Sequence, residues 1–149
     1  MSQLTDEAAH AEEGVKESLR QIQQAFNEQD LDIYARNVTE DLLNMTVYEV
    51  GGRDVVVTYS REERLAELAS IWEARPFVGT AEVKATEIYV VKDRAFATYD
   101  VLQKFKSKHD LDDSDMERRL ELFLFLKEEP GVGWQTERSM TVVRSQTSL

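Results

Sequence analysis

The chain has 149 residues, of which 42% are hydrophobic and 32% charged, with a formal net charge of −11 and no cysteine. This length and composition predict a single folded domain rather than a disordered chain. The lack of cysteine excludes disulfides, thiolate metal sites and a cysteine nucleophile, and is compatible with the cytoplasm. The negative charge disfavours nucleic acid and anionic membranes, and no apolar run approaches the roughly 20 residues that cross a bilayer. We therefore expect a cytoplasmic protein with neither nucleic acid nor a membrane as its partner.

The first residues are acidic and polar, without the basic flank or apolar run of a signal peptide. We expect a flexible leader over residues 1–11 and one domain over residues 12–149. From Glu12 to Glu28, apolar side chains recur every three or four residues, a spacing that predicts a helix with one apolar face.

Two further helices are predicted in the N-terminal half. Asp30 can cap a short helix over Leu31–Val38. Ser60 followed three residues later by Glu63 is a capping box, which predicts a third helix over Arg61–Ala74.

The rest of the chain predicts strands, because apolar and polar residues alternate between turn signals. The predicted strands are Leu42–Val50, Arg53–Tyr59, Thr80–Val91, Arg94–Lys106, Glu117–Lys127 and Trp134–Arg144. Helices followed by long antiparallel strands indicate an α+β fold in one domain.

Several short motifs occur in a recognisable order. They are the interhelical stretch Ala25–Asp32, the helix start Ser60–Glu63, the turn Lys92–Ala95 and the strand start Gly133-Trp134. In this order they resemble the nuclear transport factor 2-like superfamily, which includes ketosteroid isomerases and SnoaL-type polyketide cyclases. The resemblance implies a cystatin-like α+β roll: a cone-shaped, curved antiparallel sheet packed on the three helices, with an apolar pocket between them.

The resemblance implies that the cone binds a small, largely apolar molecule. Where the ketosteroid isomerases carry a catalytic tyrosine and aspartate, this chain has Ile22 and Thr46, and neither can replace a phenol donor or a carboxylate base. That activity is therefore not expected. The second possible function is that of an isomerase, cyclase or dehydratase that uses Glu49, Asp100 or Glu121 as acid or base. The third is that of a module for oligomerisation alone.

Aromatic side chains with polar tips, together with one arginine, are the predicted ligand-binding residues, since such groups suit a small-molecule pocket. They are Tyr34, Tyr48, Trp72, Tyr89, Tyr99, Trp134 and Arg138. Alternation places Arg138 on the same face as Trp134 and Thr136, where it would favour an anionic group of the ligand. A structural ion pair of Arg138 with Glu121 or Asp100 is the alternative.

The stretch Leu120–Leu126 is apolar on both faces, with leucines on one side and Phe123 and Phe125 on the other. A sheet with one solvated face should alternate apolar with polar residues. We expect the helices to cover one face and a second copy of the sheet to cover the other, giving a homodimer. A flap or terminal segment over that face is the alternative.

No metal or cofactor is expected. Asp110, Asp112, Ser114 and Glu121 have the spacing of a calcium loop, but Asp115 stands where that loop needs glycine. The two histidines are too few for a histidine metal site. We interpret residues 107–115 as a polar hairpin loop or a lid.

Overall fold

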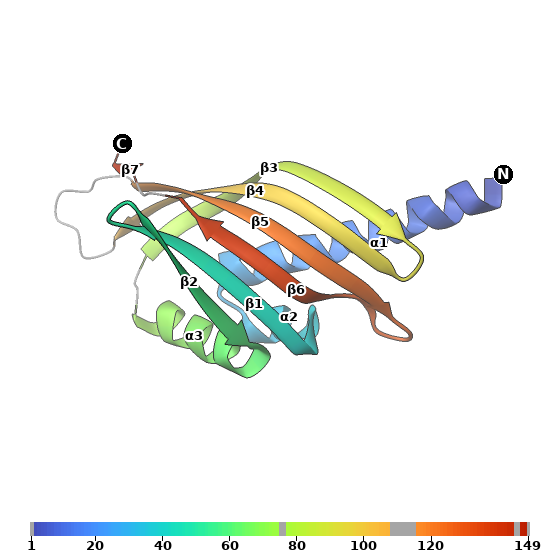
Figure 1. The fold of residues 1–149 in the computed structure, drawn as a ribbon, viewed down its shortest axis with the longest axis horizontal. Coiled ribbons are helices and arrows are strands. Elements are labelled where there is room, and N and C mark those ends of the chain that lie inside the picture. Colours follow the sequence, from blue (N-terminus) through green and yellow to red (C-terminus); the bar gives the residue numbers. More distant parts are fainter. Residues whose placement is uncertain (1, 75–76, 108–115, 145–146, 149) are drawn as a thin grey trace.

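The computed structural model describes residues 2–74, 77–107, 116–144 and 147–148. They form three α-helices and seven strands, and they confirm the α+β class (Figure 1). Helix α1 spans Ser2–Glu28 and therefore begins before Glu12, within the predicted leader. Its apolar face buries Val15 and Ile22.

Helices α2 and α3 begin as their capping residues predict. In α2, Leu31–Arg36, the Asp30 carboxylate accepts from the backbone N–H of Ile33 at 3.2 Å. In α3, Arg61–Ala74, the Glu63 N–H donates to Ser60 Oγ at 3.2 Å and the Ser60 N–H donates to Glu63 Oε1 at 2.9 Å. These reciprocal bonds satisfy N–H groups that would otherwise lack a partner in the first turn.

The main strands form one sheet in the order β2-β1-β6-β5-β4-β3. Their bounds are β1 Val38–Val50, β2 Arg53–Ser60, β3 Phe77–Val91, β4 Arg94–Ser107, β5 Met116–Glu129 and β6 Gly133–Val143. A short strand, β7 (Thr147–Ser148), pairs with β5. The sheet differs from the predicted antiparallel arrangement at one pair of strands, because β1 and β6 pair in parallel. This pairing joins the β1–β2 hairpin to the strands β3–β6, which follow α3 in the chain.

All three helices lie on one side of the curved sheet, behind the strands in Figure 1. Helix α1 packs along β3 and β6, and α3 packs on β1 and β2. We call the helix-covered side the inner face and the opposite side the outer face. No described element covers the outer face.

The described core divides into two apolar clusters on the inner face. The first lies under α1 and includes Val15, Ala97, Leu124, Leu126 and Trp134. The second lies between α1, α2 and α3 and includes Ile22, Tyr34, Leu42 and Leu68. The predicted alternation of β5 is confirmed, because Leu126 is fully buried whereas Phe125 is 51% exposed on the outer face.

Candidate functional site

A strip of polar side chains occupies the inner face on β1 and β6. Asn44 Nδ2 donates to Ser139 Oγ at 2.7 Å, and Thr46 Oγ1 donates to Asn44 Oδ1 at 2.8 Å. Asn44 and Thr46 are each 2% exposed, and Thr141 pairs with Thr46 across the strands. Burying polar groups is costly unless they are hydrogen-bonded, and Asn44, Thr46 and Ser139 are hydrogen-bonded to one another. The strip gives part of the cone a polar wall.

Helix α3 places an ion pair on the side that faces β1 and β2. Arg64 Nη1 contacts Glu67 Oε1 at 2.5 Å, and their side chains are only 10% and 15% exposed. Arg64 Nε and Glu67 Oε2 are buried and make no hydrogen bond within the described residues. Most buried polar atoms in proteins have a hydrogen-bond partner. Thr39 Oγ1, Arg61 Nε and Thr136 Oγ1 are in the same state among the described residues, but Arg64 and Glu67 combine it with an ion pair.

Two tyrosines stand beside this ion pair. Tyr59, on β2, is half-buried, as is Tyr48 on β1. The pKa of Tyr59 lies above its ordinary value, chiefly because the Glu67 carboxylate lies near its phenol, and then because of burial and the neighbouring Tyr48. A raised phenol pKa means that Tyr59 keeps its proton near neutral pH and can act as a donor.

The inner face becomes less buried toward the end of the sheet where β5 begins and β1 ends. On β5, Leu124 and Leu126 are buried, whereas Leu120 and Leu122 on the same face are half-buried. Tyr48 and Trp72 are also half-buried. Apolar groups of the inner face are thus only partly covered at this end of the cone.

Three aromatic rings line the helical side of the cone. Phe26 makes edge-to-face contacts with Tyr34 at a centroid distance of 5.8 Å and with Trp72 at 5.6 Å. Tyr99, on β4, is 6% exposed, and burial, followed by the nearby Tyr34, raises the pKa of its phenol. Five of the predicted ligand-binding residues therefore belong to the inner side: Tyr34, Tyr48, Trp72, Tyr99 and Trp134.

Trp134 and Tyr89 have different surroundings from these residues. Trp134 belongs to the cluster under α1 and is 6% exposed. Its indole approaches Gly14 so closely that a Cβ at Gly14 would meet Trp134 Cδ1 at 2.7 Å. Tyr89 is 59% exposed on the outer face, where its hydroxyl donates to Glu87 at 3.3 Å. The prediction that Tyr89 lines the cone is therefore wrong.

The prediction for Arg138 is also wrong. A β-bulge leaves Glu137 unpaired, so that Leu126 pairs with Thr136 and Phe125 pairs with Arg138. The extra residue places Thr136 on the inner face and Arg138 on the exposed outer face. Arg138 Nη1 donates to the carbonyl oxygens of Asp41 at 3.1 Å and Glu137 at 2.7 Å. Arg138 therefore does not share the face of Trp134 and Thr136, and among the described residues it makes no ion pair with Glu121 or Asp100.

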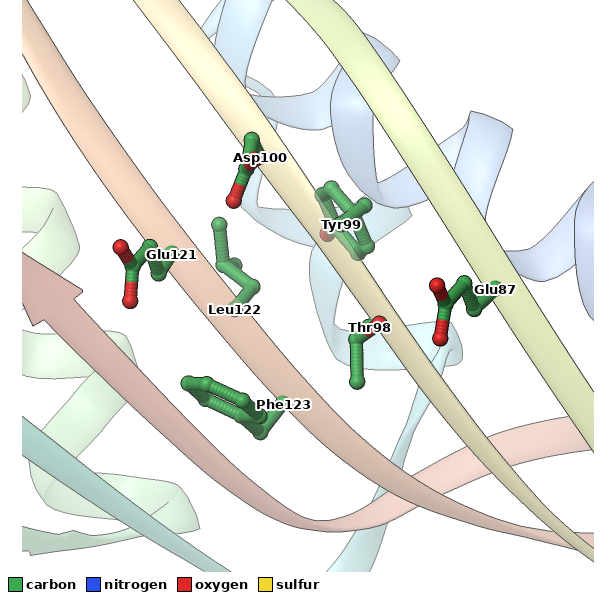
Figure 2. Close-up of a pocket in the computed structure, with 7 residues that line it drawn as sticks. All are labelled: Glu87, Thr98, Tyr99, Asp100, Glu121, Leu122 and Phe123. Atoms are coloured by element: carbon green, nitrogen blue, oxygen red, sulfur yellow. The ribbon is translucent and has the colours of Figure 1, made fainter.

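The candidate acid and base residues lie outside the cone as well. Glu49 is exposed on β1, and Asp100 and Glu121 face each other across β4 and β5 on the outer face. Glu121 pairs with Arg144 at 3.0 Å. Asp100, Glu121 and Glu87 line an open depression of about 170 Å³ (Figure 2). Strand alternation explains the error, because the inner-facing neighbour of Asp100 is Tyr99.

Sequence reasoning missed Tyr59, Arg64 and Glu67. A signal was present, because Arg64 precedes Leu68 by four residues and Glu67 precedes Ile71 by four. Residues four apart share one helix face, so both charges interrupt the apolar face of α3. Ile22 and Thr46, which stand where ketosteroid isomerases carry their catalytic tyrosine and aspartate, are both buried.

The calcium-like sequence and the suggested lid fall largely in residues 108–115, outside the described residues. Among the residues that the structure describes, no group of three or more histidine or acidic side chains could hold a metal ion. In the same residues, no helix has the length and apolar character needed to cross a membrane.

No protein-family model and no curated protein matches the chain, but solved structures do. A hexachlorocyclohexane dehydrochlorinase (LinA), type 2, matches with a TM-score of 0.72 and 13% identity over 99% of this chain and 93% of its own. A ketosteroid isomerase-like protein from Erwinia carotovora atroseptica SCRI1043 matches with a TM-score of 0.62 and 18% identity, over 87% and 93%. An NTF2-like protein from Cytophaga hutchinsonii ATCC 33406 matches with a TM-score of 0.61 and 12% identity, over 87% and 95%.

The helices and the curved sheet form an α+β cone. Its fold is that of the nuclear transport factor 2-like superfamily, as the sequence motifs predicted. Fold alone does not assign an activity, because one fold hosts unrelated functions.

Proposed function

We propose that this protein binds a small, largely apolar molecule inside the cone, between the inner face of the sheet and helices α2 and α3. One observation carries the proposal. Leu120 and Leu122 point to the same side as the buried Leu124 and Leu126, yet they remain half-buried. Binding sites for small molecules are mostly apolar and carry a few placed polar groups. The half-buried leucines, the aromatic rings and the polar strip supply both.

Native mass spectrometry of the protein as purified tests this proposal. We expect a mass above that of the chain which disappears under denaturing conditions. If the protein is isolated without a ligand, toluene supplies a defined apolar probe, and its binding can be followed by ligand-observed NMR. A protein that carries no ligand and binds no toluene contradicts the proposal.

Substitutions at two adjacent residues locate the site. Leu122→Trp adds bulk on the inner face and should abolish toluene binding. Phe123→Trp changes the next residue of β5, which points to the outer face, and should leave binding unchanged. If both variants are folded, as judged by circular dichroism, and lose toluene binding equally, the toluene site does not lie on the inner face.

The enzyme alternative relied on Glu49, Asp100 and Glu121, whose side chains lie outside the cone. Among the described residues, Glu67 is a carboxylate at the inner side, and it is the carboxylate on which acid–base chemistry in the cone could draw. Binding without an assigned reaction is therefore the better supported function.

A second copy of the chain is the partner that the outer face favours. Phe125 is 51% exposed, Leu43 is 43% exposed, and Phe125 lies 4.9 Å from Phe96 between ring centroids. Soluble monomers rarely expose large contiguous apolar surfaces. We propose a homodimer through this face, and sedimentation velocity over a range of concentrations tests it. A monomer at every concentration contradicts it.

A further inference from the structure

We propose that Tyr59, Arg64 and Glu67 form the polar end of the cone and select a neutral ligand that offers one hydrogen-bond donor and one acceptor, such as a carboxamide. This inference rests on the proposed binding function and specifies the class of ligand. It concerns residues that neither the sequence motifs nor the matched structures assign.

The unpartnered atoms of the ion pair carry the inference. Glu67 uses Oε1 for Arg64, and its Oε2 is buried without a hydrogen bond in the described residues. Arg64 uses Nη1 for this contact, and its Nε is also buried and unpartnered. The first atom is an acceptor and the second a donor. A group with one donor and one acceptor satisfies both at once.

The charges of the pair argue for a neutral ligand. A carboxylate ligand would be attracted by Arg64 but repelled by Glu67, whose Oε1 lies 2.5 Å from Arg64 Nη1. An ammonium ligand would be attracted by Glu67 but repelled by Arg64. In a poorly solvated site such opposed terms are strong, so neither ion is favoured. Tyr59 adds a neutral donor, since its raised pKa keeps the phenol protonated.

Neighbouring side chains suit the apolar remainder of such a ligand. Tyr48 lies close enough to influence the Tyr59 phenol, and both are half-buried. Strand β1, which carries Tyr48, and β2, which carries Tyr59, are the strands on which α3 packs. The polar end therefore lies beside Tyr48, a half-buried residue of the inner face.

The alternative is that Arg64 and Glu67 serve the structure alone. Buried ion pairs can often be replaced by apolar residues without loss of stability. For that reason, the replacement Arg64→Met/Glu67→Leu is a usable test, whereas changing one partner alone would leave a buried charge unpaired and could unfold the protein.

Four single-ring probes with matched shape test the selection: benzamide, benzoate, benzylammonium and toluene. Dissociation constants come from NMR titration of the full chain at neutral pH. We expect benzamide to bind about tenfold more tightly than benzoate or benzylammonium, because each ion leaves one polar group of the site opposed or unpaired. Preference for either ion, or equal binding of benzamide and toluene, would overturn the inference.

Variants identify the residues responsible. In Tyr59→Phe and in Arg64→Met/Glu67→Leu, benzamide affinity should fall to that of toluene, and toluene affinity should persist. Tyr89→Phe removes a phenol from the outer face and should change neither. If the folded variants keep the preference for benzamide, the ion pair and Tyr59 do not select the ligand. If the wild-type protein binds no probe, including toluene, binding in the cone itself fails.

Discussion

At the scale of single residues, Gly14 shows how one missing side chain positions a helix. Helix α1 passes so close to Trp134 that a Cβ at this position would lie 2.7 Å from Trp134 Cδ1 and 3.0 Å from Nε1. Glycine inside a helix normally destabilises it by about 0.5–1 kcal/mol relative to alanine. Its presence here is explained by the contact between the helix and the indole.

Gly14→Ala should therefore destabilise the protein although alanine favours the helix. We expect a net loss of about 1–2 kcal/mol in the free energy of unfolding, because overpacking costs about 1–3 kcal/mol. Urea denaturation measures it. Adding Gly14→Ala to Trp134→Phe provides the comparison, since the smaller ring leaves room for the methyl group. A stabilised Gly14→Ala protein would contradict the close contact.

Asn37 connects three elements through its side chain. Its Oδ1 accepts from Ser18 Oγ at 3.0 Å, and its Nδ2 donates to Gln21 Oε1 at 3.0 Å and to the Ile33 carbonyl at 2.8 Å. Asn37 is 5% exposed. These contacts fix α1 and α2 relative to the start of β1.

Asn37→Ala should lower the free energy of unfolding by about 2–3 kcal/mol, because several buried groups lose their partner at once. Asn27→Ala, at an exposed position of α1, is the matched control and should have little effect. Chemical denaturation of the two variants distinguishes them. Equal, small effects would mean that the Asn37 contacts contribute little.

At the scale of elements, α3 shows what sequence signals can and cannot predict. Its capping box is local, and the sequence predicted both its residues and the start of the helix correctly. The ion pair on its inner side was missed, because charged residues on a helix are usually solvated and the pattern alone does not show which charges another element will cover.

The capping box predicts a pH dependence. The Ser60 backbone N–H and its hydroxyl lower the pKa of Glu63. A lowered folded-state pKa contributes stability above the unfolded pKa, and that contribution is lost as the pH falls through the folded pKa. Wild type should therefore be more stable than Glu63→Gln at neutral pH, with the difference shrinking on acidification below the ordinary glutamate range.

Thermal unfolding of wild type and Glu63→Gln between pH 7 and 3 measures this difference. Glu62→Gln changes the neighbouring exposed residue of the first turn and should show a weaker dependence. A difference between wild type and Glu63→Gln that is constant with pH would exclude the carboxylate as the cap.

Strand β6 shows the limit of alternation. Period-two reasoning placed Trp134 and Thr136 together correctly, but it failed for Arg138 because the bulge at Glu137 adds one residue to β6. A single inserted residue reverses the facing of every later side chain. Nothing in the local residue pattern marks this bulge, since it depends on how β5 and β6 pair.

At the scale of the whole molecule, the two faces of the sheet have different surroundings. The inner face carries the core, the polar strip and the ion pair, whereas the outer face exposes Leu43 and Phe125. This contrast makes the proposed dimer testable by substitution.

Phe125→Glu should weaken self-association roughly 30-fold or more, because a charge would be buried at the centre of the proposed interface. Val132→Glu adds the same charge at a 65% exposed position beyond the strands and should leave association unchanged. Sedimentation equilibrium of both variants provides the measurement. Dimers of unchanged strength in Phe125→Glu would place any interface elsewhere.

The sequence by itself determined the starts of α2 and α3, the main strands, the two-faced character of β5 and the class of fold. These features depend on residues close in the chain, where capping and periodicity act. Only the tertiary structure decided the parallel pairing of β1 with β6, the reversal at Glu137 and the meeting of Tyr59 with Glu67. Each depends on contacts between segments distant in sequence, whose pairing no local pattern fixes.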